Sequence, residues 1–410
     1  MRILHTSDWH LGSSLAGASR EEDHERFLAW LLRAVDELGV DALVVAGDVF
    51  DQAQPTADAQ RAYYGFLAGL RGTGVRSVVI VGGNHDSPSR LDAPRELLRA
   101  FDVHVVGGMP IDEDARERCV VPLARDGRIE AVVAAVPYVH EFRLGVRTAM
   151  ADEATIRKSF HERFQSLYHG LADRCEAAGS GAPILATGHM ACAGWEKGDS
   201  PTEIHMVGSL GGLPADVFDP RFAYVALGHV HRMMPVAGSS AWYCGSPVPL
   251  CLKESATARR LLLVDVTGTD RPVVTPIEVP VARHVVEIKG PVADVADRLR
   301  TLSWDTPLPP LVMAVIEVES YRTGVEMDLQ RAIEARGDAG PKLVLATQER
   351  IGADAGATGD GDMAAGPPLR DLGPEDVFRR LCLARGETLD DRLLARFRSL
   401  VTGAAGGDAP

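Results

Sequence analysis

Five short apolar runs of this chain each lead into side chains that can bind a metal ion. In one of them, residues 43–46 run through Gly47 to the carboxylate of Asp48. Short, continuous apolar runs are typical of strands that are buried on both faces. The groups that follow such strands lie at the carboxyl edge of an open α/β sheet, where ligands bind. The other four runs lead to Asp8 and His10, to Asn84 and His85, to His189, and to His229 and His231.

These side chains offer nitrogen and oxygen ligands in a number that suits two metal ions. A mixed set of imidazoles and carboxylates favours Mn²⁺, Fe²⁺ or Zn²⁺ over Mg²⁺ or Ca²⁺. Two such ions, about 3.5–4 Å apart, activate water and stabilise developing charge in phosphoester hydrolysis. Because a shared anionic ligand offsets the repulsion between two cations, we expect Asp48 to bridge them. The predicted metal ligands are Asp8, His10, Asp48, Asn84, His189, His229 and His231.

Taken singly, each of these residues carries little weight. An aspartate after a strand is more often the cap of a helix or turn, and an isolated histidine is more often structural. Asp86 stands before Ser87 and Pro88 and could serve simply as an N-cap, so we assign it no metal role. Asp8 and His10 are two residues apart, which on an extended strand places both on one face. The prediction therefore depends on the joint pattern.

Composition restricts the classes of protein that fit. The 410 residues suffice for two or three domains, and the net charge of −14 argues against binding nucleic acid by bulk charge alone. The six cysteines are scattered, which is typical of a reducing compartment. No secretion signal and no apolar run of transmembrane length is present, so we expect a cytoplasmic protein without membrane contact. No phosphate-binding loop of the Gly-x-x-x-x-Gly-Lys type occurs, so a partner would hydrolyse any ATP.

The order of the predicted elements indicates four segments. Strands alternate with amphipathic helices from the start of the chain, which predicts a largely parallel, helix-covered sheet. A βαβαβ series without candidate ligands begins near residue 280, and a Gly-, Ala- and Asp-rich linker precedes two short amphipathic helices. We read those helices as a docking module, with folding back onto this chain as the alternative. The expected segments are a catalytic domain at 1–279, a small domain at 280–351, a linker at 352–370 and the docking segment at 371–403.

The metal-binding motifs resemble those of the calcineurin-like metallophosphoesterases in order and approximate spacing. Residues 1–12, 48–51 and 244–250 resemble more narrowly a group of bacterial nuclease subunits that act at DNA double-strand breaks. The resemblance implies an α/β (α+β) fold, a two-sheet sandwich flanked by helices with a small capping domain after residue 280. The motifs are Asp8-x-His10, Gly47-Asp48, Gly83-Asn84-His85-Asp86, Gly188-His189 and Gly228-His229-Val230-His231.

The resemblance also implies a role for each site residue. His85 would contact the scissile phosphate and assist the leaving group as a catalytic residue, without binding metal. The family implies Mn²⁺, a homodimer formed through helices near 59–70 and 88–101, and a coiled-coil ATPase partner bound by helices at 374–401. One ion would be held by Asp8, His10, Asp48 and His231, and the other by Asp48, Asn84, His189 and His229.

The function expected from these observations is hydrolysis of DNA. The chain would be a Mn²⁺-dependent double-strand exonuclease and single-strand or hairpin endonuclease in DNA repair, recombination and replication. Two alternatives stay open, namely a phosphoesterase for small molecules or phosphoproteins, and a non-catalytic scaffold of the same fold. The capping-type domain and the docking segment favour the nuclease over the small-molecule enzyme, and the intact set of site residues argues against the scaffold.

Overall fold

The structure is a computed structural model. It describes residues 1–144, 153–179, 181–192, 212–268, 271–334 and 336–351, together with scattered residues of the tail. The chain divides into two compact units, Met1–Arg350 and Ile351–Pro410. Among the described residues, no helix is both long and apolar enough to cross a membrane.

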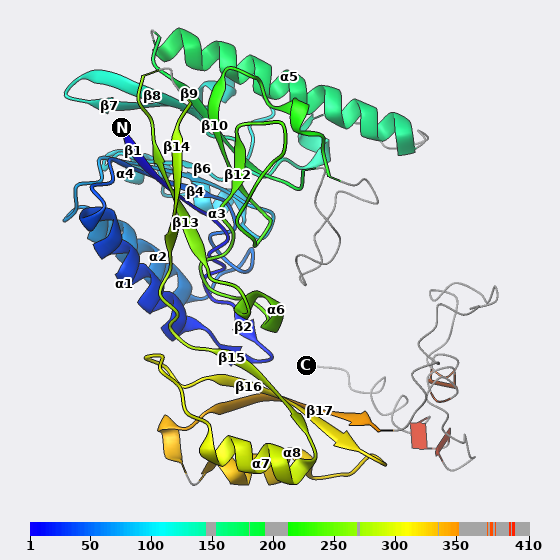
Figure 1. The fold of residues 1–410 in the computed structure, drawn as a ribbon. Coiled ribbons are helices and arrows are strands. Elements are labelled where there is room, and N and C mark those ends of the chain that lie inside the picture. The colour runs from blue at the N-terminus through cyan, green and yellow to red at the C-terminus, as the bar shows by residue number, and fades with distance from the viewer. Residues whose placement is uncertain are drawn as a thin grey trace, which may run out of the picture. The chain divides into compact units, whose positions relative to one another are not determined.

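The first sheet of the larger unit has six strands in the order β14-β13-β1-β4-β5-β6 (Figure 1). Strands β1, β4, β5 and β6 are parallel, as the alternation of strands and helices predicts, and β13 and β14 continue the sheet antiparallel. Helices α1 (Glu21–Glu37) and α2 (Ala57–Leu70) cover its outer face. The strands are β1 (Arg2–Thr6), β4 (Ala42–Ala46), β5 (Ser77–Val81), β6 (Val103–Val106), β13 (Arg260–Asp265) and β14 (Val273–Glu278).

The second sheet also has six strands, in the order β11-β12-β10-β9-β8-β7. The long helix α5 (Glu153–Gly179) packs against β7, β8 and β9, and Figure 1 shows it lying across this sheet. The strands are β7 (Val120–Arg125), β8 (Arg128–Ala134), β9 (Ile184–His189), β10 (Phe222–Gly228), β11 (Met234–Pro235) and β12 (Ala241–Tyr243).

The two sheets pack face to face, and β4 contacts both cores. Its side chains alternate, so that Val44 and Ala46 join the core between the sheets, whereas Leu43 and Val45 face α1 and α2. Full burial of a valine or leucine side chain contributes roughly 1.5–3 kcal/mol, so both faces favour apolar residues. Burial on both faces explains why this strand is a continuous apolar run. The predicted two-sheet α/β sandwich flanked by helices is confirmed.

A three-stranded parallel sheet follows residue 280, in the order β15-β16-β17. Helices α7 and α8 pack on one face of this sheet around a core of its own, and Leu15 and Leu252 contact the first residues of β15 and β16 from the other side. The predicted βαβαβ order is thus present, while a domain boundary at 280 stays a prediction. The elements are β15 (Val285–Gly290), α7 (Val292–Thr301), β16 (Leu311–Val318), α8 (Val325–Glu334) and β17 (Lys342–Arg350).

The single helix expected at 88–101 is wrong, because two short helices, α3 (Pro88–Asp92) and α4 (Arg95–Arg99), occupy this stretch. Pro94 stands between them, where it lacks an N–H donor and its ring would clash with a helical carbonyl. The remaining described elements are β2 (Ser14–Leu15), β3 (Ala18–Ser19), α6 (Leu252–Ser255) and the 3₁₀ helices η1 (Asp114–Cys119), η2 (Glu141–Leu144), η3 (Ala215–Val217) and η4 (Gly337–Ala339).

The predicted linker at 352–370 and most of the docking segment at 371–403 lie outside the described residues. Within that segment the rings of Phe378 and Phe397 stack with centroids 4.1 Å apart. The described tail residues are helical, as the two predicted helices require, and they are Glu375, Phe378, Arg379, Cys382, Leu393, Leu394, Arg396 and Phe397.

Candidate metal centre

The predicted site residues lie together at the carboxyl ends of strands from both sheets. The first sheet supplies those that follow β1, β4 and β5, and the second supplies the end of β9 and the turn after β10. The sandwich brings the two carboxyl edges together, because His189 at the end of β9 bonds to Ala46 at the end of β4. All eight predicted residues thereby converge on one centre: Asp8, His10, Asp48, Asn84, His85, His189, His229 and His231.

The backbone at four of these residues adopts the left-handed conformation that favours glycine. The φ angles are 53° at Asp8, 47° at His10, 48° at Asp48 and 92° at His229. A non-glycine residue held in such a region costs about 1–3 kcal/mol and is concentrated at functional sites. The expectation that Asp8 and His10 share one face of a strand is therefore wrong, since β1 ends at Thr6 and both residues lie in the loop beyond it.

One group of ligand atoms surrounds a point between Asp8, His10 and His231. The Nε2 atoms of His10 and His231 are 3.3 Å apart, and Nε2 of His231 lies 4.0 Å from Oδ1 of Asp8. The side chains of all three are buried, and their ligand atoms lie within 4.8 Å of one another. Oδ2 of Asp48 lies 3.5 Å from Nε2 of His10. A single cation among these atoms would satisfy nitrogen lone pairs that otherwise face each other.

A second group surrounds the side-chain oxygen of Asn84. Oδ1 of Asn84 lies 3.0 Å from Nε2 of His189 and 3.0 Å from Nδ1 of His229. Oδ2 of Asp48 lies 3.2 Å from the same Nε2 of His189. The carboxylate of Asp48 is thus within 3.5 Å of a ligand nitrogen in each group.

A hydrogen bond selects which ring nitrogen His189 presents to the centre. Nδ1 of His189 lies 2.9 Å from the carbonyl of Ala46, which can only accept, so this nitrogen carries the proton. In its neutral form, His189 therefore has its lone pair on Nε2, the atom that faces Asp48 and Asn84. Such a bond from the remote nitrogen is the usual support of a metal-binding imidazole.

The electrostatics of the buried groups suit cations. Burial disfavours the carboxylate of Asp48, but the neighbouring His189 and His10 outweigh it and hold the pKa of Asp48 well below its usual range. Burial opposes the charged form of His189, yet the charge of Asp48 raises its pKa to about 9. Burial and the charge of His189 lower the pKa of His229 to about 3. The raised pKa of His189 beside the ionised Asp48 means that this buried centre favours positive charge, which a divalent ion would supply in place of the proton.

His85 differs in its surroundings from these histidines. It is part-buried, its backbone N–H donates to Oδ1 of Asp48 at 2.9 Å, and its Nδ1 donates to the carbonyl of Asp51 at 2.8 Å. The ring centroids of His85 and His10 are 4.8 Å apart. His85 is thus fixed beside the ligand cluster, with Nδ1 protonated.

Comparison with known proteins identifies the family. Residues 1–233 match the model of the calcineurin-like phosphoesterases. This chain belongs to the calcineurin-like phosphoesterase family. It is 33% identical over 98% of its length to the SbcD subunit of the SbcCD nuclease of Escherichia coli K12, covering 97% of that protein. It is 35% identical to the protein of that name from Rhodobacter capsulatus, over 82% of this chain and 85% of the relative. The identity to the Bacillus subtilis protein is also 35%, over 65% of this chain and 66% of that relative.

Membership of this family makes the chain a metal-dependent enzyme that hydrolyses phosphate esters. The nitrogen and oxygen donors described above are of the types that divalent transition metals bind.

Sequence reasoning missed two carboxylates that contact histidines of this phosphoesterase centre. Asp51 lies 3.2 Å from Nδ1 of His10, and Glu254 lies 2.9 Å from Nδ1 of His231. Asp86 does not cap α3, whose N-cap is Ser87. The position of Asp86 at the end of the Gly83-Asn84-His85-Asp86 motif could have indicated a structural role for it. No local pattern marks Glu254.

Gly228 tests how closely the two sheets approach at the phosphoesterase centre. A Cβ atom there would lie 2.0 Å from the carbonyl oxygen of Ala46 and 2.7 Å from Nδ1 of His189. We expect Gly228→Ala to lower the free energy of unfolding by about 1–3 kcal/mol, as overpacking does. Urea denaturation followed by circular dichroism would measure the change. Gly65→Ala is the control, because a Cβ there meets open space and α2 would gain up to about 1 kcal/mol. Equal midpoints for the two variants would contradict the close approach.

Proposed function

We propose that this chain is the nuclease subunit of an SbcCD-type complex and hydrolyses DNA phosphodiesters with two Mn²⁺ ions. The activities would be exonucleolytic on double strands and endonucleolytic on single strands and hairpins, in DNA repair and recombination. The observation that carries the proposal is the position of Asp48, whose Oδ2 is within 3.5 Å of ligand nitrogens in both groups. The relatives at 33–35% identity are named as subunits of a nuclease, which supports a nucleic acid as the substrate.

In this proposal the two ions divide the ligands between them. When bound, the ions would supply activation of water and neutralisation of charge on the phosphoryl group. The chain itself orients the donors, excludes bulk water through burial and keeps Asp48 ionised. One ion would be held by Asp8, His10, Asp48 and His231, and the other by Asp48, Asn84, His189 and His229.

His85 would act on the leaving group. The bond from Nδ1 to the carbonyl of Asp51 sets the orientation of the ring, and the backbone bond to Asp48 fixes its distance from the centre. Its Nε2 would hold or donate a proton at the oxygen that departs, which is general acid catalysis worth about 10²–10⁴-fold in rate.

The partner would be an SbcC-type coiled-coil ATPase. The net charge of −14 opposes tight binding of DNA by this chain alone, and the sequence lacks a phosphate-binding loop for ATP. The helical residues around Phe378 and Phe397 support docking through 371–403. The docking segment would follow a linker at 352–370, and the complex would act in the cytoplasm. In this organisation residues 1–279 form the nuclease domain and 280–351 the capping domain.

A second copy of the chain would pair through the region of α2, α3 and α4. Three large apolar side chains in and beside these helices are exposed, Tyr64 by 39%, Leu97 by 65% and Phe101 by 44%. Exposed aromatic and aliphatic groups of this size are typical of protein interfaces. This supports the homodimer expected near 59–70 and 88–101.

The test compares the wild-type chain with His85→Ala on a blunt duplex and a DNA hairpin in Mn²⁺. A chromogenic phosphodiester serves as the control substrate. We expect the wild type to cleave DNA and the variant to be slower by about 10²–10⁴-fold, with Mn²⁺ binding retained. Hydrolysis of the small ester without cleavage of DNA, even after addition of the ATPase, would assign the chain to small substrates. Bound Mn²⁺ without any hydrolysis would favour the scaffold.

A further inference from the structure

Glu254 is a buried carboxylate with bonds on both of its oxygens. It lies in the short helix α6 and is 5% exposed. Its Oε1 is 2.9 Å from Nδ1 of His231, and its Oε2 accepts from the backbone N–H of Leu250 at 2.9 Å. Because Oε2 is occupied by a backbone donor, the carboxylate is held with Oε1 toward His231.

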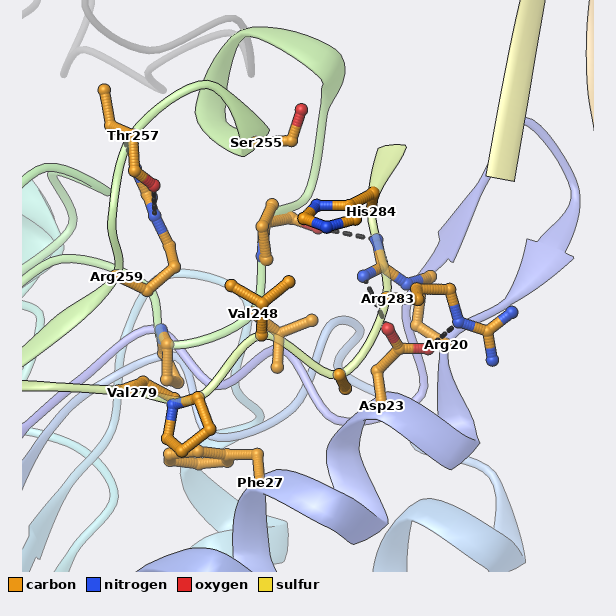
Figure 2. Close-up of a pocket in the computed structure, with 15 residues that line it drawn as sticks. Arg20, Asp23, Phe27, Val248, Ser255, Thr257, Arg259, Val279, Arg283 and His284 are labelled. Carbon is orange, nitrogen blue, oxygen red and sulfur yellow. Dashed lines mark hydrogen bonds and ion pairs between the residues drawn. The ribbon is translucent and has the colours of Figure 1, made fainter. Parts of the chain in front are cut away.

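Arg259 holds the same histidine at its backbone. Its Nη1 donates to the carbonyl of His231 at 2.9 Å, and the guanidinium also bonds to Thr257. Figure 2 shows Arg259 and Thr257 joined on one wall of a narrow cavity, with Ser255 of α6 nearby. The imidazole and the carbonyl of His231 are thus both fixed by the segment that contains α6.

This segment is itself anchored to two other parts of the larger unit. The hydroxyl of Ser255 lies 3.2 Å from the carbonyl of Val285 at the start of β15. The carbonyl of Pro249 accepts from Arg20 at 2.7 Å, and Arg20 pairs with Asp23, which also pairs with Arg283 (Figure 2). A support that cannot shift can hold a ligand within the small tolerance that a metal site needs.

The distances from Glu254 to its two neighbours show that its main contact is the imidazole of His231 and not an ion pair with Arg259. Oε2 of Glu254 is 3.9 Å from the guanidinium of Arg259, beyond hydrogen-bond range, whereas Oε1 is 2.9 Å from the imidazole of His231. The shorter contact is the one that orients a ring. His10 has a comparable partner in Asp51, but that side chain is 27% exposed.

We propose that Glu254 is a positioning residue of the metal centre: it accepts the Nδ1 proton of His231 and thereby presents Nε2, as a more basic donor, to the first ion. The proposal rests on His231 being a ligand, as assigned under the proposed function. It places the support of this ligand in α6, which also contacts the first strand of the small domain. A carboxylate behind a metal-binding histidine typically contributes about 10–100-fold to metal affinity.

The experiment measures Mn²⁺ binding to the full chain by electron paramagnetic resonance and calorimetry. We expect two ions per wild-type chain, and Glu254→Ala should bind one of them about 10–100-fold more weakly while the other is unchanged. Glu254→Gln should lose about tenfold, because its amide oxygen still accepts from His231 but the negative charge is gone. Hydrolysis by both variants should recover at high Mn²⁺ concentration, which a loss of folding would not allow.

Two reference variants separate the possible failures. Asp219→Asn alters another buried carboxylate, which pairs with Arg221 at the opposite end of β10 from His229, and it should leave Mn²⁺ affinity unchanged. His231→Ala should lose the same ion that Glu254→Ala weakens.

Wild-type affinity in Glu254→Ala, with His231→Ala impaired, would overturn the positioning role alone. Wild-type affinity in His231→Ala would overturn the ligand assignment and the inference together. If Glu254→Ala does not fold, Glu254→Gln decides, and unchanged affinity there overturns the proposal.

Discussion

Asp48→Asn is expected to abolish tight Mn²⁺ binding at both positions of the centre and to slow phosphodiester hydrolysis by about a thousandfold, or about 4 kcal/mol of transition-state stabilisation. The substitution preserves the shape of the side chain but removes the charge that lies within 3.5 Å of His10 and 3.2 Å of His189. Two cations close together require a shared anion to offset their repulsion. Metal titration together with kcat/KM on a small phosphodiester would measure both effects.

Asp41→Asn is the matched control for this substitution. Asp41 precedes β4 at the end opposite to Asp48 and accepts from the backbone N–H of Arg2 at 2.8 Å. Its loss should cost stability without changing Mn²⁺ affinity or hydrolysis. If Asp48→Asn kept one Mn²⁺ at wild-type affinity, Asp48 would serve a single ion and the bridging role would be wrong.

Asp86→Ala is expected to lower the free energy of unfolding by about 3–5 kcal/mol. The buried carboxylate accepts from the backbone N–H groups of Gly83 at 2.8 Å, Phe50 at 2.9 Å and Val49 at 3.1 Å. Each buried donor left without a partner costs about 1–3 kcal/mol, and the three costs overlap because the loops can relax. Since these bonds join the loop after β4 to the loop after β5, Mn²⁺ affinity should fall as well. Urea denaturation and metal titration would test the two effects.

Asp92→Ala provides the comparison for Asp86. Asp92 also accepts a backbone N–H, that of Gly107 at 2.7 Å, but it is part-buried and bonds to one backbone donor in place of three. We expect a loss of about 1 kcal/mol with unchanged Mn²⁺ binding. An unfolding free energy of Asp86→Ala within about 1 kcal/mol of the wild type would show that the two loops are held together by other contacts.

The sequence by itself determined the strands of the centre and the residues placed at their ends. Runs such as residues 78–81 are apolar throughout because both faces of the strand are buried, and β5 (Ser77–Val81) contains this run. Parallel strands place their carboxyl ends at one edge, so Asp48, Asn84 and His85 could be predicted to lie together. The ligand roles within that set stay predictions that the metal titrations test.

Local patterns also predicted most helices, and the sequence itself explains the one at 88–101 that was wrong. The helix expected near 59–70 is present as α2, because its apolar stripe depends on residues close in sequence. The helix expected at 88–101 was interrupted by Pro94, a residue whose effect on a helix is local and known.

Only the tertiary structure decided how the two sheets combine into one centre. His189 and His229 come from the second sheet, and they reach Asp48 and Asn84 because the sandwich apposes the carboxyl edges of both sheets. The left-handed backbone at Asp8 and His10 is imposed by the loop after β4, whose carbonyls at Gly47 and Asp48 accept their N–H groups. Neither property is encoded in a short segment.

The supporting carboxylates were beyond local sequence reasoning for the same reason. Glu254 meets a residue 23 positions away, and Asp86 accepts N–H groups from residues 36 and 37 positions away. Periodicity and spacing report on neighbours within one element, whereas these bonds form only after the elements have packed. The sequence could therefore indicate candidate metal ligands, but the groups that hold them in place depend on the packing of distant segments.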